Sequence, residues 1–277
     1  MTDAFVSVVT ALADDELIIG HRHSEWTGFA PYIEEDVAFS SIAQDEIGHA
    51  SALFSLLAEA TGSDADELAL GRDAGQYTNA LLCERENRDW AYTLSRHWLY
   101  ERADSIRLEA LSRTSHESLR ALVAKIRREE RYHTIHADTW LKRVSYGPVE
   151  GRTKLVDAFT DAFGETTGLF EPYELEGAAL EQGILPLPSS ELWQRFLDST
   201  ADALDELGLP TEIRSRLDEN AEFVASSSGD LIAGEAVAGP AAIATGLGGR
   251  RGEHSPEFEI LHKEMTSTYR EHPGASW

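Results

Sequence analysis

The sequence predicts an all-α protein built on a bundle of four helices. Long stretches carry apolar residues at intervals of three and four, which is the pattern of amphipathic helices. No stretch alternates apolar and polar residues between hairpin turn signals. Two of the expected helices also place a glutamate and a histidine three residues apart within an apolar stripe. That arrangement is typical of metal sites inside helix bundles.

The composition limits the class of protein. At 277 residues and 42% hydrophobic content, the chain can form one helical domain with additions and a sizeable core. It has no apolar run of about 18 residues and no basic start followed by an apolar stretch, so we expect neither a membrane span nor a signal peptide. The single cysteine, Cys83, cannot form an internal disulfide. A cytoplasmic protein is therefore expected, whose metal ligands would be histidines and carboxylates.

The charge is strongly acidic, with 24 basic against 49 acidic residues and a net charge of −25. Nucleic acid is not an expected partner, because binding it requires basic patches. Only four of the basic residues are lysines. An acidic, lysine-poor surface is typical of adaptation to high salt, where screening relieves self-repulsion. An acidic protein from ordinary salt conditions is the alternative interpretation.

Four long helices are expected in the first half of the chain. Thr2 or Asp3 can cap the first helix, and Gly28 and Pro31 end it. The second stops at the turn signal around Gly62, and the fourth begins after a capping threonine or serine and ends before a Gly-Pro pair. The expected ranges are 3–26, 32–60, 89–112 and 116–144, with an irregular connection at 61–88 that includes a short helix at 64–70.

The second half is expected to add helices to this core. Helices are predicted at 150–169, 173–182, 189–207, 212–224 and 255–270. A segment rich in glycine and alanine, 226–249, is expected to be a loop or weakly helical. We therefore expect one domain over 1–277, with a metal-binding four-helix core at 1–147 and additional helices and a tail at 148–277.

The spacing Glu-x-x-His is a weak signal on its own. With 31 glutamates and 10 histidines in 277 residues, chance predicts about one such pair, and three occur. The pair Glu259 and His262 falls on the polar side of its helix with Lys263, so we expect a solvated face there. The other two pairs, Glu46 with His49 and Glu130 with His133, lie within apolar stripes of long helices.

The two inward pairs indicate a metal site because their side chains are expected to be buried. A buried carboxylate and imidazole are costly unless they are paired or bind a metal. The first and third helices must then supply further ligands, and Glu25 and Glu101 are the candidates, with Glu16 and His23 as less favoured competitors on the first helix. The alternatives are a surface carboxylate for Glu25, an arginine partner for Glu101, and satisfied polar groups in the core for the two pairs.

The set predicts a two-metal site in a ferritin-like four-helix bundle, with one carboxylate or one Glu-x-x-His pair per helix. The predicted ligands are Glu25, Glu46, His49, Glu101, Glu130 and His133. Carboxylates can bridge two metals, and one imidazole per metal suits iron, with manganese as an alternative. Asp45, Asp104 and Glu129 are candidates for orienting the histidines from outside.

At these residues the sequence resembles the phenylacetyl-CoA ring epoxidase subunits of aerobic phenylacetate degradation. The ligand-bearing stretches are similar to those of the catalytic A subunit, namely HSEWTG at 23–28, DEIGH at 45–49, WLYE at 98–101 and EERYH at 129–133. Over its whole length the chain is more similar to the paralogous C-type subunits, in EWTGFAP at 25–31, RREERYH at 127–133, GGRRGEH at 248–254 and the terminal Trp277.

The resemblance implies a function. It implies two iron ions, O2-dependent epoxidation of the phenyl ring of phenylacetyl-CoA, a homologous catalytic partner and a separate flavin and iron–sulfur reductase, in a homo- or hetero-oligomer. The C-type subunits have generally lost metal ligands and serve as structural partners, whereas this chain keeps all six predicted positions. The alternatives are a structural partner within the complex, or a stand-alone ferritin-like protein that handles iron or peroxide.

Overall fold

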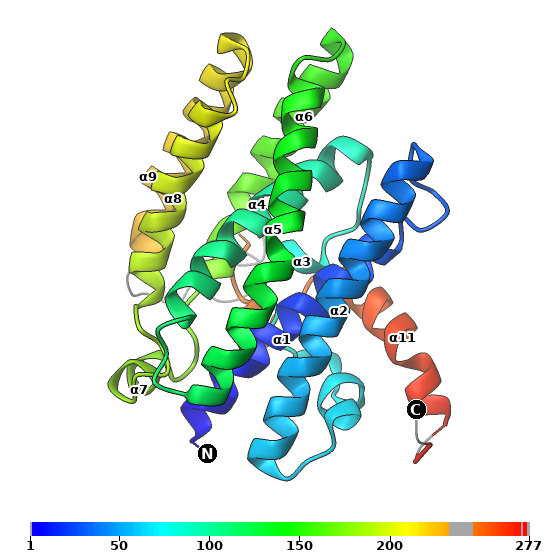
Figure 1. The fold of residues 1–277 in the computed structure, drawn as a ribbon, viewed down its shortest axis with the longest axis vertical. Coiled ribbons are helices and arrows are strands. Elements are labelled where there is room, and N and C mark those ends of the chain that lie inside the picture. Colours follow the sequence, from blue (N-terminus) through cyan, green and yellow to red (C-terminus); the bar gives the residue numbers. More distant parts are fainter. Residues whose placement is uncertain (1, 233–245, 273, 276–277) are drawn as a thin grey trace.

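The computed structural model describes residues 2–232, 246–272 and 274–275, and all regular structure in these ranges is helical (Figure 1). The all-α prediction is confirmed. The longer helices are α1 (Asp3–Ser24), α2 (Ile33–Thr61), α4 (Trp90–Leu111), α5 (Glu117–Ser145), α6 (Val149–Glu165), α8 (Ser189–Glu206), α9 (Thr211–Ile232) and α11 (Pro256–Glu271). Short helices are α3 (Leu81–Glu84) and α7 (Glu176–Glu181).

Helices α1, α2, α4 and α5 form the four-helix core. Helix α1 packs most extensively on α2, and α4 on α5, while α2 and α5 close the bundle. The close approach of α1 and α2 depends on Gly20, where a Cβ atom would lie 2.8 Å from Ile47 Cγ1 and 3.2 Å from Glu46 Cβ. A larger residue at this position would push the two helices apart beside the glutamate of the first Glu-x-x-His pair.

The additional helices cover the core on two sides (Figure 1). Helices α6 and α8 pack over α4, α9 packs on α6 and α8, and α11 contacts the connection between α2 and α4. The prediction of one helix at 150–169 is corrected, because α6 ends at Glu165 and a 3-10 turn follows at Thr166–Phe170. Within the segment expected as a loop or weak helix, residues 226–232 continue α9, and 233–245 lie outside the described residues.

None of the helices in the described ranges has both the length and the apolar character needed to cross a bilayer.

A buried ion network ties the C-terminal segment to α1. Arg250 donates to Asp15 from both terminal nitrogens, at 2.9 Å and 2.7 Å, and Arg107 of α4 donates to the same carboxylate at 2.5 Å. The backbone of this segment is seated closely, because a Cβ atom at Gly249 would lie 2.1 Å from the carbonyl oxygen of Asn79. A segment more than 230 residues downstream thus neutralises an acidic residue in the first helix.

This network predicts an acid-sensitive contribution to stability. Burial alone raises the pKa of Asp15, but Arg250 and Arg107 outweigh burial and hold this pKa below its usual value. A carboxyl group whose pKa is lower in the folded state stabilises the protein above its unfolded pKa of about 3.9, and this stabilisation is lost as the pH falls below that value.

We therefore expect the free energy of unfolding to decrease on acidification below about pH 4, and Asp15→Asn to reduce that slope. Urea titrations at several pH values, compared between the native protein and Asp15→Asn, measure it. An unchanged slope in the variant would show that Asp15 does not carry this pH dependence.

Candidate metal centre

The four core helices bring buried carboxylates and histidines together in the middle of the bundle. Two groups of three residues each offer ligand atoms that lie within 4.8 Å of one another. The first group is Glu16, His49 and Glu130, and the second is Glu46, Glu101 and His133. Helices α1 and α4 each contribute one carboxylate, and α2 and α5 each contribute one Glu-x-x-His pair, all of them buried.

The two Glu-x-x-His pairs are crossed between the groups. Glu46 of α2 joins His133 of α5, and Glu130 of α5 joins His49 of α2. Glu130 Oε1 lies between the two histidines, 3.2 Å from His49 Nδ1 and 3.3 Å from His133 Nδ1. This carboxylate therefore links the two groups into one cluster.

Glu25 was predicted as a ligand, but the structure places it outside the cluster. Helix α1 ends at Ser24, so Glu25 is its C-cap residue; the side chain is 39% exposed and bonds to Arg22 at 2.6 Å and Asn87 at 2.8 Å. The structure places Glu16 in the cluster instead, with Oε2 3.2 Å from His49 Nδ1. The spacing contained this signal, because Glu16 follows Leu12 by four residues on an apolar stripe of the first helix.

Two of the three expected outer partners contact the histidines, again in a crossed pattern. His49 Nε2 donates to Glu129 at 2.9 Å, and His133 Nε2 lies 3.4 Å from Asp45. Both histidines thus turn Nδ1 towards the cluster, which is the role that such outer partners have at metal sites. Asp104 was also predicted to orient a histidine. Its carboxylate instead accepts a hydrogen bond from Arg107 at 2.9 Å.

Several buried polar atoms in the cluster lie close to one another but form no hydrogen bond of normal geometry with any residue that the structure describes. They include both carboxylate oxygens of Glu101, both of Glu130, and Nδ1 of His133. Unsatisfied buried polar groups are rare and costly in folded proteins, more so when they are charged. Carboxylate oxygens and imidazole nitrogens that face one another without partners fit a pair of divalent cations.

The pKa values of the cluster residues are shifted because these charged groups are buried close to one another. Burial, reinforced by the neighbouring carboxylates, raises the pKa of Glu46 and of Glu101 well above the usual range. For Glu130, the close approach of His133 and His49 outweighs burial and lowers the pKa of the carboxyl group. For His49, Glu130 and Glu16 outweigh burial and raise the pKa to about 11. Protons thus offset the charge of the carboxylates in the protein without metal, a role that bound cations can take over.

Three further buried histidines surround the cluster. His23 donates from Nδ1 to Glu46 at 2.9 Å, and His97 Nδ1 lies 3.3 Å from Glu101. His136 contacts His97 at 3.4 Å and donates to Glu35 at 2.9 Å. His23 was predicted only as a competitor, and His136 was not predicted, although its position three residues after His133 places it on the same helical face.

The third Glu-x-x-His pair lies elsewhere in the fold. Glu259 is exposed, as predicted. His262 is not, because its Nε2 donates to the carbonyl of Arg72 at 3.0 Å and its ring packs on Tyr77. The prediction of a fully solvated pair is therefore wrong for the histidine, which packs α11 against the core.

Comparisons with known proteins agree with the resemblance to phenylacetyl-CoA epoxidase. A family model described as phenylacetic acid catabolic protein matches residues 1–233, a range that includes all the helices of the cluster. A similar protein is the C component of the 1,2-phenylacetyl-CoA epoxidase of Escherichia coli (strain K12). It is 33% identical over 174 residues, which cover 62% of this chain and 70% of the relative.

Proposed function

The chain belongs to the phenylacetic acid catabolic protein family, and from this premise we propose that it is a subunit of a multicomponent phenylacetyl-CoA epoxidase with a two-metal centre of its own. Its proposed partners are a homologous catalytic subunit and a flavin and iron–sulfur reductase. The similarity to the C component of such an epoxidase supports membership of the complex, and the buried cluster supports the metal centre.

The observation that supports the metal proposal is the set of buried ligand atoms that form no hydrogen bond within the described part of the chain. The residues that would hold the two metals are Glu16, Glu46, His49, Glu101, Glu130 and His133. The mixture of carboxylate and imidazole favours iron, with manganese as the alternative. When bound, two irons would supply the activation of O2 needed to insert an oxygen atom into the phenyl ring.

The protein's own part is to orient the ligands. Glu129 and Asp45 accept the Nε2 protons of His49 and His133 from the outer side. That tautomer leaves the Nδ1 lone pairs directed at the carboxylates of the cluster. Tyr100 adds a further constraint, because its hydroxyl donates to Glu16 at 3.1 Å and fixes that side chain.

Metal content tests the proposal. Protein produced with added iron and purified without chelator should contain about two iron ions per chain, the stoichiometry of a carboxylate-bridged site in such bundles. Elemental analysis measures this directly. A folded protein without bound metal under these conditions would overturn the proposed centre and leave the structural role.

A structural role in the same complex is the second candidate. It is favoured by one observation, the similarity to the C component of such an epoxidase. To separate the two roles, the complex would be assembled with a variant chain that loads no metal, such as Glu130→Gln. Full turnover of that complex would support the structural role, and lost turnover in a correctly assembled complex would support the catalytic one.

A further inference from the structure

The outward side of α5 is basic in a chain that is otherwise strongly acidic. Helix α5 contains seven lysines and arginines and four acidic residues, a local charge of +3 in a chain of −25. Its exposed cations include Lys125, Arg127, Arg128 and Arg131, which we call the basic face. These four residues enter none of the ion pairs within the described part of the chain. Because the molecule as a whole repels anions, an acidic partner would be drawn to this face.

The acids of α5 do not cancel this charge at the surface. Glu130 belongs to the cluster, Glu129 bonds to His49, and Asp138 pairs with Arg102. The remaining acid of α5 lies in its first turn. The acids in the middle of the helix are thus turned towards other side chains, while the cations of the basic face are turned to solvent.

Two apolar side chains stand among these cations. Tyr132 is 50% exposed and Ile135 is 61% exposed. Lys125, Arg128 and Tyr132 follow one another at intervals of three and four residues, so they share one stripe of the helix surface. Tyrosine and arginine are enriched at the centres of protein interfaces. The composition of this face therefore fits a protein partner.

The same stripe lies beside the metal centre. Glu129 follows Lys125 by four residues, and its carboxylate accepts a hydrogen bond from His49 at 2.9 Å while the side chain is 39% exposed. Across the contact between α5 and α2, Asp45 is 42% exposed and lies 3.4 Å from His133. Each histidine of the cluster is thus one contact away from a partly exposed carboxylate at this surface.

Tyr132 connects the surface to the cluster through its ring. The ring lies edge to face with that of His133, with 6.3 Å between the ring centroids. It also lies 6.3 Å from the ring of His136. A half-exposed aromatic ring is therefore packed against a proposed metal ligand. Rings in contact that lead from the surface to a metal ligand form a suitable path for an electron.

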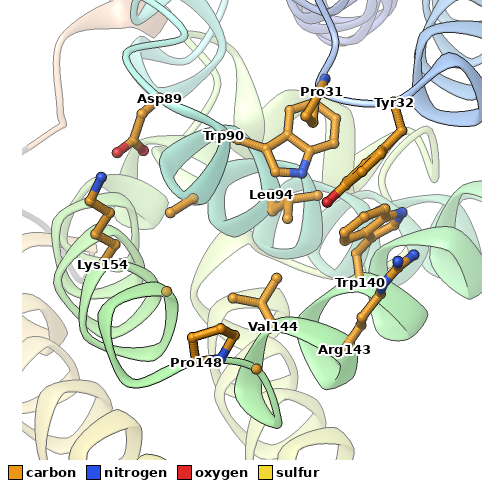
Figure 2. A pocket seen from close by; sticks show the side chains of 13 residues that line it. Pro31, Tyr32, Asp89, Trp90, Leu94, Trp140, Arg143, Val144, Pro148 and Lys154 are labelled. Atoms are coloured by element: carbon orange, nitrogen blue, oxygen red, sulfur yellow. The ribbon is translucent and has the colours of Figure 1, made fainter.

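The basic character continues beyond the end of α5 in a different form. Residues 142–154 contain four basic residues and one acidic residue. Among them Arg143 lines a pocket of about 400 Å³ together with Trp90 and Trp140 (Figure 2). Its guanidinium lies over the ring of Trp140 at 4.6 Å, and Asp89 lines the same pocket. The basic face in the middle of α5 is therefore the surface that adjoins the metal centre.

A second copy of this chain is a poor fit for the basic face. Contacts between identical subunits are most often two-fold, so that the same patch meets itself. Such a contact would place Arg128 and Arg131 against their own counterparts, and like charges in contact are unfavourable. The net charge of −25 adds a general repulsion between copies. An acidic protein of another kind fits this surface better.

We propose that the basic face of α5 docks an acidic protein domain that carries single electrons. The acids of the carrier contact the four cations, and its redox group rests beside Tyr132. Each encounter oxidises the carrier by one electron, which passes by way of Tyr132 and His133 and reduces the proposed metal pair by one electron, with no bond formed or broken. This inference rests on the proposed function, which requires a supply of electrons, and adds the place where they enter this chain.

Binding is tested first, on the full chain without metal. The probe is a plant-type ferredoxin, an acidic iron–sulfur protein that carries one electron. Calorimetry at low salt measures its affinity. We expect saturable binding that weakens as salt is added, because exposed charges more than about 10 Å apart are largely screened at 0.1 M salt. Affinity that does not change with salt would contradict a docking surface made of exposed cations.

Charge reversals locate the surface. Arg128→Glu and Arg131→Glu should each weaken ferredoxin binding by roughly three- to tenfold, the range expected for one exposed charged contact. Arg195→Glu is the matched control, because it makes the same change of charge at an exposed position on α8 and should leave the affinity unchanged. Equal affinity in all three variants would overturn the docking surface.

The path of the electron is tested on metal-loaded protein, by stopped-flow mixing with reduced ferredoxin. Tyr132→Leu should change binding little but lose most of the rate of metal reduction, because the ring that contacts His133 is removed. Tyr132→Phe keeps the ring and should keep the rate. An unchanged rate in Tyr132→Leu, or an equal loss in Tyr132→Phe, would overturn the path through the ring.

The binding assay separates this inference from the proposed function. Because it uses no metal, salt-sensitive binding that depends on Arg128 would support the docking surface whether or not the chain loads iron. A chain that loads iron but shows no saturable binding up to about 1 mM ferredoxin would overturn the docking surface and leave the metal centre intact. Salt-sensitive self-association that Arg128→Glu abolishes would assign the face to a second copy and would overturn the proposal too.

Discussion

Glu130→Gln should abolish metal loading while the helical bundle remains folded. Glu130 contacts the histidines of both groups, so its replacement would remove a carboxylate that lies against both. The amide also lacks the negative charge that offsets the cations. We expect a loss of affinity greater than the roughly 10- to 100-fold decrease caused by removing an outer partner of a metal ligand.

Elemental analysis and far-ultraviolet circular dichroism of the same samples measure metal and fold together. Glu25→Ala and Glu259→Ala are matched controls, because both glutamates lie outside the cluster and both variants should load metal normally. Full loading of Glu130→Gln would contradict the assignment of the cluster. Loss of metal in Glu25→Ala would restore the ligand set expected from the sequence.

Arg250→Ala should destabilise the protein by about 3 kcal/mol or more, because breaking a buried ion pair leaves a charge without compensation. The side chain of Arg250 is 1% exposed and that of Asp15 is fully buried. Arg107 remains beside Asp15 in the variant, which places the expected cost at the lower end of the range for buried pairs. The variant also leaves the carbonyl of Thr78 without its donor at 2.7 Å.

Urea unfolding followed by circular dichroism measures this cost. Arg195→Ala provides the comparison, since Arg195 and Glu191 form a pair whose side chains are 44% and 46% exposed, and exposed pairs contribute at most about 1 kcal/mol. If Arg250→Ala fails to fold, Arg250→Lys keeps the charge and should be intermediate in stability. A cost for Arg250→Ala no larger than that of Arg195→Ala would show that the network does not hold the C-terminal segment.

The helices and both inward Glu-x-x-His pairs could be predicted because they depend on local periodicity. Apolar residues at helical spacing placed Glu46, His49, Glu130 and His133 on inward faces, and the structure brings all four together. The outer partners Asp45 and Glu129 were predictable for the same reason, since each stands directly before a glutamate of the cluster.

The error on the first helix has a physical cause. Asp14, Asp15 and Glu16 are three consecutive acidic residues, a pattern that normally indicates a surface, yet all three are buried. Their burial depends on partners remote in the sequence, with Arg72 on Asp14 and Arg250 on Asp15. No local pattern contains these pairings, so Glu25 at the helix end was favoured over Glu16.

The pocket lined by Tyr32, Trp90 and Arg143 was not predictable for a similar reason. Tyr32, Trp90 and Arg143 come from three separate segments, and only the packing of the bundle places them around one space. The excess of positive charge at 142–154 was present in the sequence. The pocket beside this segment could not be predicted, because no periodicity indicates which segments will meet in the fold.

The link between Asp15 and Arg250 also bears on how the chain is made. Asp15 precedes its partner arginine by 235 residues, so α1 is synthesised long before that arginine is added. Until then Asp15 has at most Arg107 to balance it, so the first helix cannot reach its final buried position at full stability. Domains usually fold as units as they emerge, but here the helix that carries Glu16 is completed only by a late segment. Assembly of the cluster is therefore expected to follow the synthesis of residues 246–254 and to be coupled to their docking.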